Sequence, residues 1–322
     1  MLNHLGRAIA SAGDKAEYDA AVKEVLADKQ VLSWILKWVT KEFSDMEIDK
    51  IIPCIENPMV ATVPVFPGLT NEAIDGMKNE SKINGEGLVT YDVRFNVNIP
   101  GDTQKKAIKF IVDVEGQKEP NPGYDLVTRG IFYSGRMLSD QMGRNLTGED
   151  YDNLEKVYSI WIVFNSPQKN ANTTVSYKIK PELIHGNMKI NNRYDLLTVV
   201  EIKLPSENNY DKCANTPTEL HNMLFDVFVR KENSTEKMKR LEEKYNLKTK
   251  DLERRITTMC NLSECVEERG EANATARINS LNSWLFANGR MNDAVKAAND
   301  PSYQKKLISE MEEAKKQEHK TE

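Results

Sequence analysis

The sequence predicts an α/β protein, in which helices flank a mixed central sheet, with a mainly helical C-terminal extension. Two strand-like stretches, 89–97 and 108–117, are followed by a helix-like run at 124–141 and an apolar strand at 157–164. Strands that alternate with helical patterns are typical of α/β domains. The composition changes after residue 212, and the remaining segments favour helix.

The first strand-like stretch has the two-residue period of a half-buried strand. Its apolar residues alternate with polar ones, as the pairs Tyr91 and Asp92, Val93 and Arg94, and Phe95 and Asn96 illustrate. This period predicts one strand that continues through Tyr91 and Asp92, with the Asp92 carboxylate on its polar face.

The second stretch has the same period and carries a row of polar groups. Asp113, Glu115 and Gln117 fall on one face, opposite the apolar positions. The turn signal Pro100-Gly101-Asp102 joins the two strands as a hairpin. A hairpin of this kind can bring Asp92 beside Glu115 at one end of the sheet, which would offer two hard oxygen ligands to a divalent cation.

The segments before this hairpin differ in character. Apolar positions between Lys15 and Phe43 recur at helical spacing, which predicts an amphipathic helix broken near Asp28. Four prolines between 51 and 87 restrict regular structure there, so we expect an edge strand at 61–66 and a loop at 68–87.

The segments after the apolar strand predict more sheet and then helices. Strand composition recurs at 175–179 and 196–202. Helix-start signals follow at Thr216-Pro217-Thr218-Glu219, at Asn233 with Glu236, and at Asp300-Pro301; Asn279–Ala294 favours a helix, a turn and a helix at a bundle corner. We therefore divide the chain into a sheet domain at 1–212, a helical region at 213–309 and a charged, fraying tail at 310–322.

Composition limits the classes of function. The chain has 322 residues and a formal charge of −5, so any DNA contact must use a local basic patch. No apolar run approaches the ~20 residues that span a bilayer, and the N-terminus lacks the apolar core of a signal peptide, which together predict a cytoplasmic protein without a membrane partner. The four cysteines form no zinc-ligand pattern and are expected as reduced thiols.

The order of these elements resembles the PD-(D/E)XK nuclease superfamily, in particular its transposase-like, recombination-promoting branch from bacteria. The resemblance covers residues 16–204 and rests on Asp92, the hairpin, Glu115 and Gln117, the helix with Arg129, Tyr133 and Gln141, and the apolar strand after it. It implies a restriction-endonuclease-like core that acts on DNA. In the family fold, Asp92 and Glu115 bind Mg²⁺, with Mn²⁺ as a substitute, and residue 117 helps to place the attacking water. A matching Arg129 and Tyr133 would meet a phosphate and support the site.

Two positions depart from the pattern of the superfamily. Tyr91 stands before Asp92 where proline is usual, and Gln117 stands where lysine is usual. A neutral amide supplies no positive charge, although it can orient a water molecule by hydrogen bonding. Glu42, Glu86 and Asp113 are candidates for a further acidic ligand, against the alternatives of solvated charges or salt bridges.

Other chemistry has little support in the sequence. There is no phosphate-binding glycine-rich loop with its lysine, no dinucleotide fingerprint, no HExxH motif and no nucleophile elbow. The basic run from Lys237 to Arg255 is interleaved with acidic residues, as on a solvated helix.

Two functions remain. The first is a magnesium-dependent DNA endonuclease associated with mobile elements or recombination, whose C-terminal helices serve self-association or DNA placement. The alternative is a catalytically silent nuclease-like fold that acts as a DNA-binding or assembly module.

Overall fold

The computed structural model describes residues 4–56, 58–60, 80–83, 87–100, 108–118, 120–141, 151–190 and 193–321. The chain forms two compact units, one of residues 16–261 and one of residues 1–15 with 262–322. The sheet, the predicted site residues and the helices up to Asn261 belong to the first unit. Residues 213–261 thus lie in the same unit as the sheet, whereas the sequence pattern suggested a boundary after residue 212.

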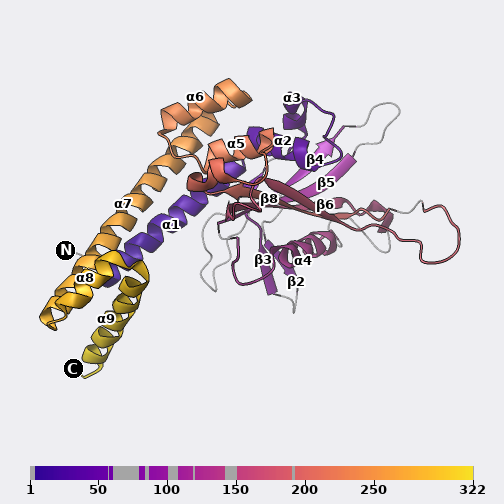
Figure 1. The fold of residues 1–322 in the computed structure, drawn as a ribbon. Helices are drawn as coiled ribbons and strands as arrows, with labels where there is room; N and C mark the ends of the chain where they lie inside the picture. The colour runs from indigo at the N-terminus through magenta and orange to yellow at the C-terminus, as the bar shows by residue number, and fades with distance from the viewer. Residues whose placement is uncertain are drawn as a thin grey trace. The chain divides into compact units, whose positions relative to one another are not determined.

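A six-stranded mixed sheet forms the centre of the larger unit (Figure 1). Its strands, in spatial order, are β1 Met59–Val60, β4 Val93–Ile99, β5 Ile108–Gln117, β6 Lys156–Ser166, β8 Leu197–Pro205 and β7 Thr173–Lys178. The pairs β5 with β6 and β6 with β8 are parallel, and the other pairs are antiparallel. The predicted hairpin of β4 and β5 and the strands at 157–164, 175–179 and 196–202 are confirmed.

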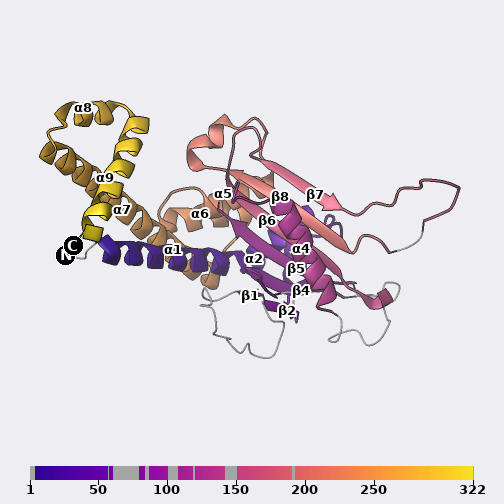
Figure 2. The ribbon, with the colours of Figure 1, turned by 90° about the horizontal axis from the view of Figure 1, so that it is seen from below.

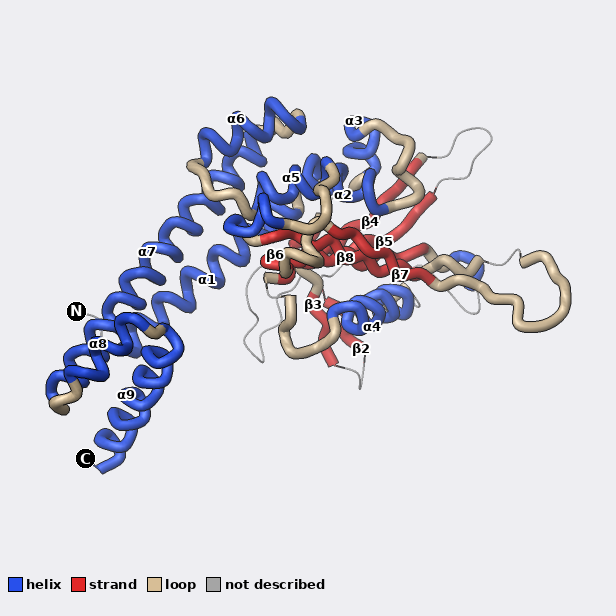
Figure 3. Tube along the Cα trace, in the orientation of Figure 1, coloured by secondary structure: helices blue, strands red, loops and turns tan. Residues whose placement is uncertain are grey.

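Helices cover both faces of this sheet (Figure 3). The helix α4, Leu126–Ser139, packs on β6 and β8 from one side, and α5, Glu219–Phe228, packs on β8 and on α2, Lys29–Val39, from the other. The predicted half-buried pattern holds over much of β4, since Val93, Phe95 and Val97 are buried while Asn96 and Asn98 are less so. Arg94 departs from this pattern: it is only 1% exposed, and Asp140 at the end of α4 accepts a hydrogen bond from its guanidinium at 3.1 Å.

The predicted strand 89–97 is interrupted before β4. Residues Gly87–Thr90 form β3, which pairs with β2, Glu80–Ile83, in a separate two-stranded sheet. The Tyr91 ring turns inward and packs edge-on against Tyr133 of α4 at 5.3 Å between ring centroids. This burial breaks the alternation, so that Tyr91 and Asp92 connect two sheets. The strand β2 also replaces part of the loop predicted at 68–87, while the edge strand predicted at 61–66 lies outside the described residues.

The N-terminal helix is broken where the sequence predicted. Helix α1, His4–Leu26, ends just before Asp28, and Asp28 caps α2 by accepting a hydrogen bond from the Gln30 backbone N–H at 2.9 Å. Short helical segments follow at α3, Ile48–Ile51, and in the 3₁₀ turns Ile52–Cys54, Tyr151–Asn153 and Glu207–Lys212.

The start of α5 lies two residues later than predicted. Thr218, and not Thr216, is the N-cap, and the side chain of His221 accepts a hydrogen bond from the Thr218 backbone N–H at 3.2 Å. A histidine thus takes the place in the capping box that glutamate usually holds. The next helix, α6, Ser234–Tyr245, begins after Asn233 as predicted.

The smaller unit contains the predicted bundle corner. Helix α7, Lys250–Ala287, and α8, Met291–Asn299, are joined through Gly289, whose φ of 69° suits glycine. Within 262–322 the helices bury an apolar cluster of Leu281, Leu285, Ala297, Leu307 and Met311. Helix α9, Pro301–Thr321, begins after Asp300 as predicted and continues through the segment predicted as a charged tail. None of the described helices is long and apolar enough to cross a membrane.

Candidate functional site

The carboxylates of Asp92 and Glu115 meet where β4 begins and β5 ends. The Asp92 backbone N–H donates to Glu115 Oε1 at 3.0 Å, and the Gly116 backbone N–H donates to Asp92 Oδ2 at 3.2 Å. The register explains this contact, because Val93 of β4 lies opposite Val114 of β5 and the next residues outward are Asp92 and Glu115. The predicted juxtaposition of the two side chains is therefore present.

A lysine from α1 completes this contact. The Lys23 ammonium lies 2.9 Å from Asp92 Oδ1 and 2.9 Å from Asp19 Oδ2. Burial lowers the pKa of Lys23, but its contacts with Asp92 and Asp19 raise the pKa above its usual value, so the group stays charged. The helix comes close enough because Gly116 has no side chain; a Cβ there would lie 3.3 Å from the Leu26 Cδ1 atom. Sequence reasoning missed Lys23, since its helical pattern shows an apolar face but not what that face covers.

Asp113 lies behind Glu115 in the interior of the protein. Its side chain is fully buried, and its Oδ2 atom accepts a hydrogen bond from the Ser159 hydroxyl at 3.1 Å. The Trp161 indole N–H donates in turn to that hydroxyl at 2.9 Å. The Asp113 Oδ1 atom has no hydrogen-bond partner among the described residues.

The surroundings of Glu115 and Asp113 make their ionisation costly. Burial raises the pKa of Glu115 well above its usual value, and the neighbouring Asp113 and Asp92 raise it further. Burial also raises the pKa of Asp113. Positive charge placed among these groups would relieve both effects.

The residue types, but not their arrangement, suit a hard divalent cation. Asp92, Asp113 and Glu115 supply only oxygen atoms, and the unpartnered Asp113 Oδ1 is the kind of atom that an ion would satisfy. In the arrangement of the described residues, however, no three acidic, histidine or cysteine side chains gather closely enough to hold a metal ion. An ion here would keep several water ligands, as Mg²⁺ commonly does.

Gln117 is the last residue of β5 and lies in register with Val163 of β6. Strand alternation places it on the same face as Asp113 and Glu115, as predicted. Its side chain is partly exposed, and Lys118 after it is exposed. The amide therefore lies at the solvent-facing end of the row of acidic residues.

The predicted pair on α4 also flanks this row. The Arg129 guanidinium donates to Tyr133 Oη at 2.5 Å and to the hydroxyl of Tyr124, and it lies 5.5 Å from the ring centroid of Trp161. Burial raises the pKa of Tyr133 to about 12, and the nearby charge of Glu115 contributes. A cation from α4 thus faces the acidic row, in addition to Lys23 from α1.

The other acidic candidates lie elsewhere. Glu42 accepts a hydrogen bond from Tyr158 Oη at 2.6 Å and pairs with Lys156 at 3.2 Å, near the start of β6, so it acts there as a salt-bridge partner. Glu86 lies outside the described residues. A buried carboxylate that sequence reasoning missed is Glu201 of β8, which lies opposite Trp161 in the sheet and accepts a hydrogen bond from Tyr177 Oη at 3.0 Å.

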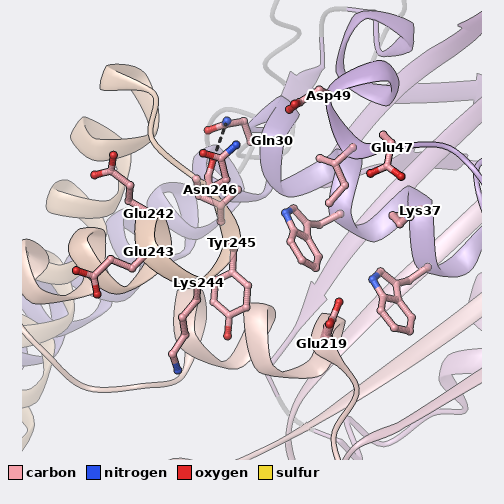
Figure 4. Close-up of a pocket in the computed structure, with 14 residues that line it drawn as sticks. Gln30, Lys37, Glu47, Asp49, Glu219, Glu242, Glu243, Lys244, Tyr245 and Asn246 are labelled. Carbon is pink, nitrogen blue, oxygen red and sulfur yellow. Dashed lines mark hydrogen bonds between the residues drawn. The ribbon is translucent and has the colours of Figure 1, made fainter.

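A separate cleft of about 510 Å³ lies between α2, the start of α5 and the end of α6 (Figure 4). None of the predicted site residues lines it. Its charged lining consists of Glu47, Asp49, Glu219, Glu242 and Glu243 with Lys37 and Lys244. This excess of negative charge would repel a phosphate backbone, so we place the chemistry at Asp92 and Glu115 instead.

The basic run from Lys237 to Arg255 does not form an open cationic patch. Lys237 is buried and donates to backbone carbonyl oxygens, including that of Arg230 at 2.6 Å. Arg240 pairs with Glu232 at 3.0 Å, and Lys244 pairs with Asp226 at 3.4 Å. Internal pairing thus uses much of the positive charge of this run.

Comparison of the chain with protein-family models, with curated proteins and with solved structures finds no match. The functional argument therefore rests on the residues and their geometry. Asp92, Asp113 and Glu115 come together between a lysine of α1 and an arginine of α4.

Proposed function

We propose that the protein is a divalent-metal-dependent DNA endonuclease with a restriction-endonuclease-like core, belonging to the bacterial cytoplasm and associated with mobile elements or recombination. The observation that supports this most is the contact of Asp92 with Glu115, backed by buried Asp113 and its unpartnered oxygen. Glu115 and Asp113 are buried near each other, which is costly in a protein interior unless a cation offsets their charge.

Asp92 and Glu115 would hold Mg²⁺ or Mn²⁺, with water in the remaining positions. Such an ion, when bound, supplies a nucleophilic water at neutral pH and neutralises charge on the phosphodiester. The remaining roles belong to side chains of the protein itself.

Gln117 orients the attacking water through its amide, since it lies on the same face as Glu115 and nearer to solvent. Arg129 binds a phosphate oxygen, and Tyr133 fixes its guanidinium through the hydrogen bond of 2.5 Å. Lys23 supplies the positive charge that Gln117 lacks, because its ammonium already lies 2.9 Å from Asp92.

A second function has a specific observation in its favour. Two backbone N–H groups and the Lys23 ammonium already bind the carboxylates of Asp92 and Glu115. These contacts would also suit a site without catalytic activity, whose carboxylates only fix α1 to the sheet. The protein would then be a DNA-binding or assembly module. The two functions differ in whether substitution at Glu115 changes phosphodiester cleavage.

The test is nicking of supercoiled plasmid in Mg²⁺ or Mn²⁺ by the wild type, Glu115→Gln and Asp92→Asn. Both variants keep an oxygen that can accept the backbone hydrogen bonds, so we expect them to fold. The nuclease proposal requires that the wild type nicks the plasmid and that both variants lose this activity. If the wild type nicks no faster than Glu115→Gln with any metal or DNA substrate, the silent module is the better description.

A further inference from the structure

The connection between β7 and β8 extends away from the sheet as a long segment without helix or strand (Figures 1 and 2). We call residues 179–190 of this segment the arm. Its base is anchored on the side of β8, where Arg193 donates to the carbonyl oxygens of Asp152 and of Leu154, the latter at 2.8 Å. Asp195 pairs there with Lys156 at 3.3 Å.

The arm itself forms no hydrogen bond with other described residues, although the hydrogen bonds of Arg193 and the ion pair of Asp195 fix its base. Its large apolar side chains also face solvent. Ile184 is 93% exposed and Met188 is 62% exposed, and Ile179 and Leu183 are about half exposed. Exposed apolar side chains that cluster in this way are typical of an interaction surface, since their burial would contribute about 25 cal/mol for each Å² removed from water.

The charge of the arm is positive, in a chain whose net charge is −5. Lys178 at its base and Lys180 and Lys189 within it form no ion pair among the described residues, and Glu182 is the one acidic residue of the segment. In the run 237–255, Lys237 is buried and Lys244 is paired, whereas Lys248 and Lys250 are exposed. The arm is a local basic patch of the kind that DNA contact by an acidic protein requires, and unlike that run it also carries exposed apolar side chains.

We propose that the arm binds duplex DNA, with its lysines on the phosphates and with Ile184 and Met188 against sugars and bases in the minor groove. The choice of DNA rests on the proposed function, and charge complementarity favours it over an apolar protein partner. Apolar side chains that enter the minor groove beside basic groups are a known mode of DNA binding, and they can partly unstack a base step.

The distance between the base of the arm and the carboxylates suits one duplex. Lys178 at the base of the arm lies opposite Thr198 of β8, and Glu201 of β8 lies level with Trp161 and with Glu115. The base is thus about 10 Å along the sheet and about 14 Å across it from Glu115, because β7 and β5 are three strand spacings apart. Both lie within one turn of DNA, which is about 34 Å long.

The first test measures the salt dependence of binding to a fluorescent 30-base-pair duplex by anisotropy in EDTA. Each phosphate contact contributes about 0.9 to the slope of log affinity against log salt. Combined Lys178→Gln, Lys180→Gln and Lys189→Gln should reduce the slope by about 2 to 3. The matched control, Lys305→Gln with Lys306→Gln on exposed positions of α9, should leave the slope unchanged.

The second test concerns the apolar contacts. Ile184→Ser with Met188→Ser should weaken binding about tenfold without a change in salt slope, because the loss is of apolar burial and not of charge. The same variant should abolish the fluorescence increase of a duplex that carries 2-aminopurine at the bound step. Val295→Ser, at a position of α8 that is 66% exposed, is the control for loss of an exposed apolar side chain.

Two results would overturn the proposal. One is unchanged DNA affinity in both arm variants. The other is sedimentation velocity showing that Ile184→Ser with Met188→Ser dissociates an oligomer while DNA binding persists, which would assign the arm to a second copy of the chain. Failure of the nuclease proposal is distinct: if the wild type binds DNA through the arm but never cleaves it, the arm stands and the endonuclease does not.

Discussion

The Lys23 ammonium of α1 lies 2.9 Å from the Asp92 carboxylate at the start of β4. This contact joins a helix from the N-terminal segment to the sheet end where Glu115 lies. It also brings a cation to a site whose glutamine, Gln117, supplies none.

The Lys23 to Asp92 pair should contribute measurably to stability. Both side chains are largely buried, with exposed fractions of 19% and 18%, so the pair is screened less than a surface salt bridge. In a double-mutant cycle of Lys23→Met and Asp92→Asn, we expect a coupling energy of about 1 to 2 kcal/mol. Urea denaturation without metal measures it. Coupling near zero would mean that the contact is incidental.

Lys23→Met should also reduce cleavage about 10²-fold or more, if the ammonium stabilises charge on the phosphate. Lys23→Arg keeps the charge and should retain part of the activity. Equal activity of the wild type and Lys23→Met, in protein shown to be folded, would remove Lys23 from the proposed mechanism.

Metal binding should depend on Asp92 and Glu115. We expect weak binding of Mn²⁺ by the wild type in calorimetry, since two or three carboxylates leave most of the coordination shell to water. Asp92→Ala and Glu115→Ala should remove this binding. Glu42→Gln is the matched acidic control, because Glu42 pairs with Lys156 instead and should not affect it. The same Mn²⁺ affinity in all four proteins would disprove the site.

Substitutions at Gln117 should affect the placement of the attacking water without affecting ion binding. Gln117→Ala should lose about 10²-fold in cleavage yet retain Mn²⁺ binding, because an amide adds little to the charge that holds an ion. Gln117→Lys places a cation where the superfamily usually has lysine, and it should keep partial or full activity. Plasmid nicking with parallel calorimetry measures both effects. Loss of Mn²⁺ binding in Gln117→Ala would contradict this division of roles.

The packing of α4 on the sheet should be sensitive to one methyl group. A Cβ at Gly130 would lie 2.6 Å from Val199 Cγ1 and 2.9 Å from Trp161 Nε1, whereas a Cβ at Gly135 meets nothing within 4 Å. Gly130→Ala should therefore destabilise the fold by about 1 to 3 kcal/mol. Gly135→Ala should stabilise it by about 0.5 to 1 kcal/mol through lower chain entropy. Urea denaturation of the two variants should show opposite signs.

Acid should weaken the cap of α5. Burial lowers the pKa of His221 below its usual 6.5, because it disfavours the charged ring. The neutral ring accepts the hydrogen bond from the Thr218 backbone N–H. The unfolded chain then binds a proton more readily than the folded one, so this contribution to stability is complete above pH 6.5 and is lost as the pH falls toward the lower folded pKa. His221→Gln has no such titration. The wild type should lose more stability than this variant between about pH 7 and pH 5, near the intrinsic range of histidine.

Much of the fold follows from local patterns. The two-residue period at 89–97 and 108–117 predicted the hairpin of β4 and β5, although the first strand begins only at Val93. The pattern also predicted the helix break near Asp28 and the helix start at Asn233, and both side chains cap a helix by accepting hydrogen bonds from free backbone N–H groups. The same hairpin register brought Asp92 next to Glu115. These features depend on residues close in sequence or paired across one turn, which is why the sequence alone determined them.

Tertiary structure decided what covers the strands. Arg94 is buried although it lies on the polar face of β4, because Asp140 at the end of α4 pairs with it, and the strand is broken because the Tyr91 ring enters the core against Tyr133. Lys23 reaches Asp92, about seventy residues away in the chain, because Gly116 lets α1 approach the sheet. The alternation of polar and apolar residues indicates that a strand has two different faces. The burial of each face, however, depends on helices from distant segments, and no local pattern encodes how those helices pack.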